Sequence, residues 1–206
     1  MKFQNLPSIL PLYAANGIIL LPRAQLPLML QGRSEKAIIE CALRDGHRLV
    51  GVIQANPEGG HFQKGCVGRI INFQDGAQVF VILGGLCRFK IEEVLEDEPL
   101  KKARVSYQGY EGDLDDSLAD PFVDRPRLLN LLKDYLEDQD IMANWDEIDH
   151  ASNDLIISSL SMACPFKPIE KQALLEISSL SERCDMMIAL MEMASPHLKG
   201  RRPMIH

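Results

Sequence analysis

The 206-residue sequence lacks any long, uninterrupted run of apolar side chains. Its most apolar early stretch, residues 6–30, is broken by four prolines and by Arg23. A membrane-spanning helix needs about 20 apolar residues in succession, and a signal peptide has a basic start and small residues at its cleavage site. Neither pattern is present, so we expect a cytoplasmic protein that does not contact membranes.

Metal and redox motifs are missing as well. The five cysteines are widely spaced and form no Cys-x-x-Cys, and the five histidines form no His-Glu-x-x-His. These absences argue against a zinc ribbon and a dithiol redox site, and they leave no pair of histidines at metal-ligand spacing. We expect the cysteines to be reduced, small side chains of the core, and we expect the protein to use no metal or cofactor.

Signatures of catalysis are incomplete. Residues 60–65 have the glycine spacing of a phosphate-binding loop, but Cys66 and Val67 stand where that loop needs a lysine and a Ser or Thr. No serine lies in a Gly-x-Ser-x-Gly context, which is typical of a hydrolase nucleophile. We therefore predict no catalytic residue. The alternative is an enzyme whose site is assembled from residues far apart in the sequence.

Acidic residues outnumber basic ones, 29 to 22, and they are spread unevenly. Residues 1–110 carry a net charge of +3, and residues 111–206 carry −10. Near the break lie four aspartates without the glycine and glutamate of an EF-hand calcium loop: Asp113, Asp115, Asp116 and Asp120. We interpret them as part of a solvated acidic linker. The negative net charge also argues against a general affinity for nucleic acid or anionic lipid.

Short apolar segments bounded by turn residues dominate the first half and predict β-strands. The expected strands are residues 17–22, 26–30, 48–54, 67–73, 79–83, 86–91 and 103–107. A helix is predicted over Ser34–Gly46, where apolar residues recur at helical spacing. Asp75-Gly76 predicts a tight hairpin, because glycine tolerates a positive φ. So many short strands without regular intervening helices favour a small closed or half-closed barrel.

The second half has apolar residues at helical spacing. The expected helices are residues 127–136, 153–162, 168–177 and 179–194. Pro168 suits a first helical turn, and Ser179 with Glu182 forms a capping box. We therefore expect an α+β chain with a barrel subdomain at 1–112, the acidic linker at 113–126, a helical bundle at 127–195 and a frayed tail at 196–206.

Several motifs in a fixed order carry a resemblance to a known family. They are Leu10-Pro-Leu12, Leu26-Pro-Leu28, Leu49-Val-Gly-Val52, Gly65-Cys-x-Gly-Arg-Ile70, Gly84-Gly-x-Cys-Arg-Phe89, Asn144-Trp145 and the segment Pro165–Glu176. In this order they resemble the amino-terminal, substrate-binding domain of Lon proteases, and the second half is similar to stand-alone bacterial members of that family. The resemblance covers residues 8 to 195.

The resemblance implies a PUA-like, mostly antiparallel β-barrel with one inserted helix, followed by a carboxy-terminal helical bundle. It also implies a role in binding polypeptides or partner proteins. Lon proteases carry an ATPase module and a peptidase domain after this region, whereas this sequence ends at His206, so we expect neither here. Gln31–Glu35 stands where relatives have a Phe-Glu-Pro-Arg-Tyr stretch, so contacts made by that stretch cannot be carried over.

The prediction is therefore a non-catalytic module that binds unfolded or partner polypeptide, either along an exposed strand edge or in an apolar groove between barrel and helices. The candidate contact residues are Met29, Leu30, Arg33, Phe62, Met187 and Met191. Methionines at helical spacing are also typical of core packing. RNA binding, known among PUA-like barrels, is a second alternative. The oligomeric state and any association with a full-length protease in trans stay open.

Overall fold

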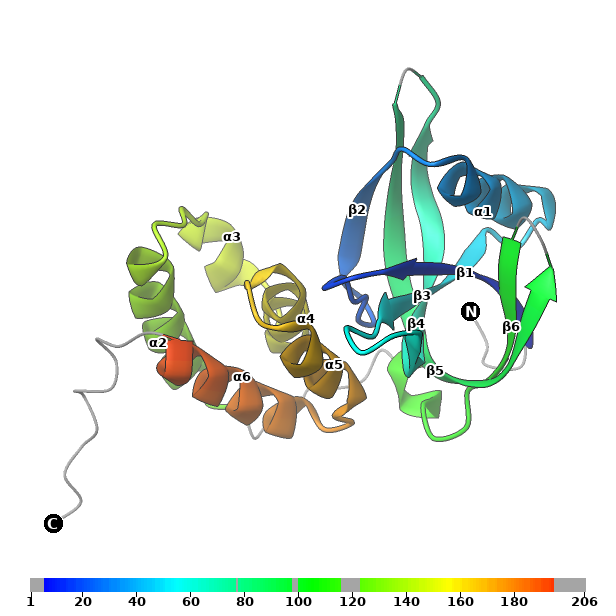
Figure 1. Cartoon of the computed structure of the whole chain (residues 1–206). Helices are drawn as coiled ribbons and strands as arrows, with labels where there is room; N and C mark the ends of the chain where they lie inside the picture. The colour runs from blue at the N-terminus through cyan, green and yellow to red at the C-terminus, as the bar shows by residue number, and fades with distance from the viewer. Residues whose placement is uncertain (1–5, 77, 98–99, 116–122, 195–206) are drawn as a thin grey trace, which may run out of the picture.

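The computed structural model describes residues 6–76, 78–97, 100–115 and 123–194. The first half forms a six-stranded sheet and the second half a group of helices (Figure 1). The strands are β1 (Ile9–Ala15), β2 (Gln25–Leu30), β3 (Leu49–Ala55), β4 (His61–Gln74), β5 (Val79–Asp97) and β6 (Leu100–Ser106). Helix α1 (Arg33–Arg44) is inserted between β2 and β3. This is the α+β arrangement that the sequence predicts.

The pairing of the strands closes on itself. The order β5-β4-β3-β1-β6 returns to β5, because the second half of β5 pairs with β6. Strand β2 pairs with the first half of β5. Among the described strands, every pair is antiparallel except β1 with β3. The sheet is therefore mostly antiparallel, while its PUA-like identity stays a prediction.

Strand β5 is longer than the sequence indicates. The predicted strands at 79–83 and 86–91 are one continuous strand that runs through Gly84 and Gly85. The loop after β1 lies against Gly85: the Arg23 amide donates to the Gly85 carbonyl at 2.9 Å, and the Gly85 amide donates to the Ala24 carbonyl at 2.8 Å. Gly85 therefore allows another backbone to approach the strand, and neither glycine ends it.

Residues 17–22, predicted as a strand, form part of this loop, so that prediction is wrong. The side chains of Ile19, Leu20 and Leu21 are nevertheless at most 2% exposed. The apolar pattern thus predicted the burial of this segment correctly but predicted its backbone conformation wrongly. A strand that the sequence patterns did not predict, β1, lies just before the loop, at Ile9–Ala15.

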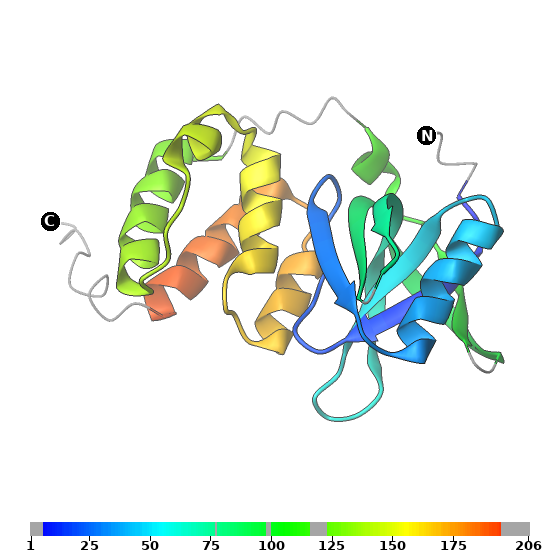
Figure 2. The same ribbon diagram turned by 90° about the horizontal axis from the view of Figure 1, so that it is seen from above.

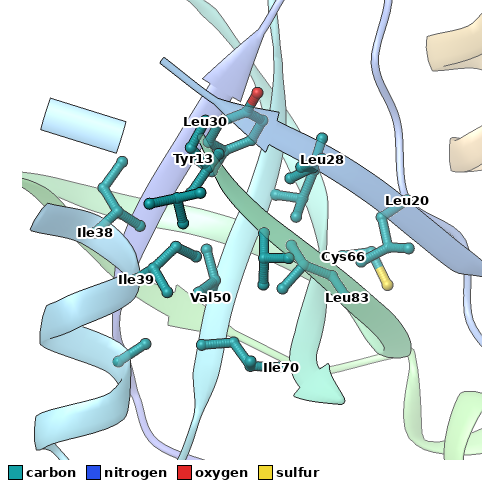
Figure 3. Packing of buried hydrophobic residues seen from close by; sticks show 14 residues of the cluster. Tyr13, Leu20, Leu28, Leu30, Ile38, Ile39, Val50, Cys66, Ile70 and Leu83 are labelled. Atoms are coloured by element: carbon teal, nitrogen blue, oxygen red, sulfur yellow. The ribbon is translucent and has the colours of Figure 1, made fainter. Parts of the chain in front are cut away.

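Helix α1 covers one side of the sheet through its apolar stripe. Ile38, Ile39 and Ala42 are buried against side chains from β1, β2, β3, β4 and β5, and Figure 3 shows Ile38 and Ile39 directed toward Tyr13 and Val50. A second buried cluster, which includes Phe89, lies where β5 meets β6. The sheet therefore has one apolar core against the first half of β5 and another against residues 87–91.

The helices of the second half are α2 (Arg125–Asp138), α3 (Trp145–His150), α4 (Asn153–Ala163), α5 (Pro168–Glu176) and α6 (Leu180–Ala194). They share one buried core and lie beside the sheet in both views (Figures 1 and 2). The four predicted helices are confirmed, whereas the short α3 was not predicted. Within the described residues, no helix is both long and apolar enough to span a bilayer. The predicted tail at 196–206 lies outside the described residues.

Arg88 of β5 joins the sheet to the helices and is 4% exposed. Its guanidinium donates to both carboxylate oxygens of Asp113 at 2.7–3.3 Å, and the Asp113 side chain is 8% exposed. It also donates to the carbonyls of Leu175 at 3.3 Å and Ile177 at 2.5 Å, where α5 ends. Arg88 thus forms a buried ion pair with Asp113, so the assignment of Asp113 to a solvated linker is wrong.

Further polar contacts cross the same junction. The Gln54 amide donates to the Pro168 carbonyl at 2.9 Å, and Lys64 pairs with Glu176 at 2.8 Å. Arg23 pairs with Asp154 of α4 at 2.8 Å. A small apolar cluster of Ile19, Leu21 and Leu175 lies among them. The predicted apolar groove between sheet and helices is, at these positions, a filled and largely polar contact.

Replacing Gly85 with Ala tests the close approach of the loop to β5. A Cβ at this position would lie 2.0 Å from the Leu21 carbonyl oxygen, so the loop or the strand must move. We expect a loss of about 1–3 kcal/mol of unfolding free energy, as measured by urea denaturation. Gly112→Ala is the control, because nothing lies within 4 Å of its added Cβ. Equal stability of the two variants would contradict the packing described.

Replacing Asp113 with Ala tests the buried ion pair. The change leaves the Arg88 guanidinium buried without its counter-charge, and we expect a loss of about 3–5 kcal/mol of unfolding free energy. Glu93→Ala is the matched control, since it breaks the exposed pair with Arg104 and should cost about 0–1 kcal/mol. A small effect at Asp113 would show that the junction does not depend on this pair.

Candidate functional site

The outward side of β2, β4 and the first half of β5 carries apolar side chains. In the β2–β5 ladder Pro27 lies opposite Ile82 and Met29 lies opposite Phe80. Side chains alternate along a strand, so these four share one face, while Leu28 and Leu30 point to the core. The register thus places two apolar pairs side by side on the outside of the sheet.

A bulge in β4 adds a fifth apolar side chain. The β4–β5 register shifts between Ile70 and Asn72, which leaves Ile71 as an extra residue. A Cβ on Gly84 would lie 3.3 Å from Cγ2 of Ile71, so Ile71 lies on the outward side, over Gly84. We call Pro27, Met29, Ile71, Phe80 and Ile82 the outer apolar face.

The exposure of these side chains sets the face apart from the core. Met29 is 55% and Ile71 50% exposed, Pro27 is exposed, and Phe80 and Ile82 are half-buried. Their inward neighbours Val79, Val81 and Leu83 are at most 4% exposed. A run of adjoining apolar side chains on a surface is typical of a site that binds another macromolecule.

Strand β2 is the edge strand of the sheet beside the outer apolar face. In the described residues it pairs with β5 alone, so no strand lies along its other edge. Pro27 lies in the middle of β2 and has no N–H to donate. A proline on an edge strand obstructs pairing with a further strand. The arrangement therefore favours contact with the outer apolar face over a full extension of the sheet.

Three of the predicted contact residues lie in the core. Leu30 is 1% exposed and faces the cluster that α1 covers. Met187 and Met191 are 0% exposed within the helical core, on the inward stripe of α6. In this structure they stabilise the fold and offer no surface to a bound polypeptide, because each lies on the side of its element that packs against its neighbours.

The other three predicted residues lie nearer the surface but do not all come together. Met29 belongs to the outer apolar face. Arg33 is exposed at the start of α1, three residues after β2 ends. Phe62 is half-buried near the start of β4, at the opposite end of that strand from Ile71. Contact of these residues with a polypeptide stays a prediction.

Sequence reasoning missed Pro27, Ile71, Phe80 and Ile82. For Phe80 and Ile82 a signal was present in the sequence, because all five side chains of residues 79–83 are apolar. A strand with one solvated face alternates apolar and polar residues, so an unbroken apolar run indicates that both faces need a covering partner. Among the described residues, the protein's own core covers only the inward one.

The four buried thiols of the described residues are not activated for nucleophilic chemistry. Burial raises the pKa of the Cys66 thiol well above its usual value, raises that of Cys87 to about 12, and raises those of Cys164 and Cys184 to about 11. These thiols are therefore protonated at neutral pH and are poor nucleophiles. Over the described ranges, no three His, Cys, Asp or Glu side chains gather as metal ligands would.

The chain was then compared with known proteins. Residues 9–193 match the model of the family described as the ATP-dependent protease La (LON) substrate-binding domain. A Lon protease from Cytophaga hutchinsonii is 33% identical over 116 residues, covering 52% of this chain and 14% of that protein. A Lon protease from Anaeromyxobacter dehalogenans is 25% identical over 214 residues, covering 95% and 24% respectively. The chain thus spans a quarter or less of the length of these relatives.

Solved structures show the same fold. A Lon N-terminal domain protein from Xanthomonas campestris superposes with a TM-score of 0.63 at 20% identity, covering 89% of this chain and 98% of that one. The N-terminal domain of Lon protease from Mycobacterium avium complex gives a TM-score of 0.64 at 17% identity with the same coverage. Because the family model matches nearly the whole described chain, the protein belongs to the Lon substrate-binding domain family.

Proposed function

We propose that this protein is a non-catalytic module that binds polypeptides through the outer apolar face. The observation that carries the proposal is the exposure of Met29 and Ile71, 55% and 50%, on a strand surface that they share with the apolar side chains of Pro27, Phe80 and Ile82. The family description, a substrate-binding domain, supports the same function. Removing such side chains from water stabilises a complex by about 25 cal/mol of free energy per Å² of apolar area.

The bound segment in this proposal is extended and apolar, and it is held by side-chain contacts. Two rows of the face, Pro27 with Ile82 and Met29 with Phe80, form a shallow surface that accepts many sequences. Unfolded chains expose aliphatic and aromatic side chains that folded chains bury, so the face distinguishes the two states. Backbone pairing along β2 has a smaller role, since Pro27 interrupts that edge.

The proposal extends to features that accompany this function. It includes a PUA-like identity for the cyclic sheet, which the ring of pairings from β5 back to β5 supports. It also includes a cytoplasmic location and two subdomains, 1–112 and 127–195. In this proposal a full-length protease acting in trans degrades the segments that this protein binds. RNA binding receives less support, because Arg88, one of the basic residues of the sheet, is buried in an ion pair.

Charged substitutions on the face test this function. The double variant Met29→Asp with Ile71→Asp should bind a fluorescein-labelled, permanently unfolded reporter polypeptide at least about tenfold more weakly than the unchanged protein, in an anisotropy titration. Both side chains are exposed, so the fold should survive, which circular dichroism checks.

Met193→Asp is the matched control, because Met193 is 61% exposed on α6, far along the chain from the face. Its binding should equal that of the unchanged protein. Equal weakening in the control and the double variant, or no weakening in either, would overturn the assignment of binding to the outer apolar face.

A further inference from the structure

Two carboxamide side chains continue the rows of the outer apolar face onto β4. Asn72 lies opposite Ile82 in the β4–β5 ladder, and Gln74 lies opposite Phe80. Side chains directly opposite each other in an antiparallel pair lie on the same side of the sheet, so both carboxamides point outward. Both residues are exposed. Each row of the face therefore passes from an apolar side chain on β2, across one on β5, to a carboxamide on β4.

The apolar face by itself provides contacts only for the side chains of an extended segment. Each residue of such a segment also carries an N–H and a C=O, which are hydrogen-bonded to water before binding. Contact with the face removes part of that water, and a main-chain group left without a partner weakens the complex. Pro27 obstructs strand pairing along β2, the sheet edge beside the face. The main chain of a segment bound there therefore needs other hydrogen-bond partners.

The two carboxamides have the spacing that an extended main chain requires. A strand rises about 3.3 Å per residue, so Asn72 and Gln74, two residues apart on β4, lie about 6.6 Å apart along it. In an extended chain every second residue directs both its N–H and its C=O to the same side, so these groups recur with the same repeat. A carboxamide both donates and accepts hydrogen bonds. Each carboxamide can therefore pair with the N–H and the C=O of one residue of the bound chain.

The neutrality of these polar groups indicates what they recognise. A carboxylate or an ammonium group would select ligands of the opposite charge, whereas a carboxamide is uncharged and has the same donor and acceptor groups as a peptide bond. The outward side chains of the two rows are all uncharged: Pro27, Met29, Asn72, Gln74, Phe80 and Ile82. The rows therefore match an uncharged main chain better than a charged side chain.

We propose that Asn72 and Gln74 hydrogen-bond the main chain of a bound, extended polypeptide while the outer apolar face contacts its side chains. The inference rests on the proposed function and specifies its substrate class: extended segments whose N–H and C=O groups are available. Helices and paired strands use those groups internally, so folded proteins are excluded. Every residue except proline has the same main-chain groups, so the site accepts many sequences but disfavours proline-rich ones.

A variant with a more apolar surface separates main-chain binding from apolar contact. Asn72→Leu with Gln74→Met removes both carboxamides and nearly preserves the size of the two side chains. This variant should bind the unfolded reporter polypeptide about tenfold more weakly than the unchanged protein in an anisotropy titration. Binding by apolar contact alone would be equal or tighter, and that result would overturn the proposal. Gln139→Met, at the exposed residue that follows α2, is the control and should bind like the unchanged protein.

A change in the ligand tests the same contact in the unchanged protein. The probes are a labelled eleven-residue peptide, with leucine at alternate central positions and glycine and serine elsewhere, and a depsipeptide with the same side chains. In the depsipeptide, esters replace the four central amides and remove their N–H groups. The unchanged protein should prefer the peptide by about tenfold, whereas Asn72→Leu with Gln74→Met should bind both probes equally.

The charged face variant distinguishes failure of this inference from failure of the proposed function. Met29→Asp with Ile71→Asp should weaken the binding of both probes by the same factor and leave the preference for the peptide unchanged. If the unchanged protein binds both probes equally, or binds neither at millimolar concentration, while the face variant still weakens binding of the unfolded reporter, the main-chain proposal is overturned and the proposed function stands. If the face variant does not weaken binding of the reporter, the proposed function fails as well.

Discussion

The buried guanidinium of Arg88 is the interaction on which the placement of the helices against the sheet depends. A buried cation is unfavourable unless its donors find acceptors, and here Asp113 supplies the opposite charge while the carbonyls at the end of α5 accept hydrogen bonds from Nη1. These carbonyls carry partial negative charge, because no further helical turn satisfies them. Arg183 donates to the same Ile177 carbonyl at 2.7 Å, and its own burial lowers its pKa to about 10.

Strand β5 connects this junction to the surface proposed for binding. Its first half is apolar on both sides, with the inward side covered through α1 and the outward side left as the outer apolar face. Its middle, at Gly85, admits the loop after β1, and Arg88 follows three residues later. One strand thus contributes to the core, the junction and the binding face, so a change in its register would disturb all three.

Elements whose ends depend on local chemistry were predicted well. Helices α4 and α5 begin at the predicted residues and end within one residue of the prediction, because Ser152 caps one and Pro168 starts the other. Features that depend on partners far away in the sequence were predicted wrongly. The loop at 17–22 has a strand-like sequence, but the backbone just after it is hydrogen-bonded to Gly85 of β5 instead of extending as a strand. Asp113 lies in an acidic run of the sequence, yet its side chain is buried in an ion pair with Arg88, which is 25 residues earlier.

The sequence by itself determined the α+β class, five of the helices, most of the strands and the family, because these follow from periodicity, capping residues and ordered motifs that are local in the chain. Only the tertiary structure decided which apolar residues are surface and which are core. Met29 and Leu30 are adjacent and equally apolar, yet the pleat of β2 turns one to solvent and the other inward. That choice, like the partner of Arg88, depends on strand register and on residues far away in sequence.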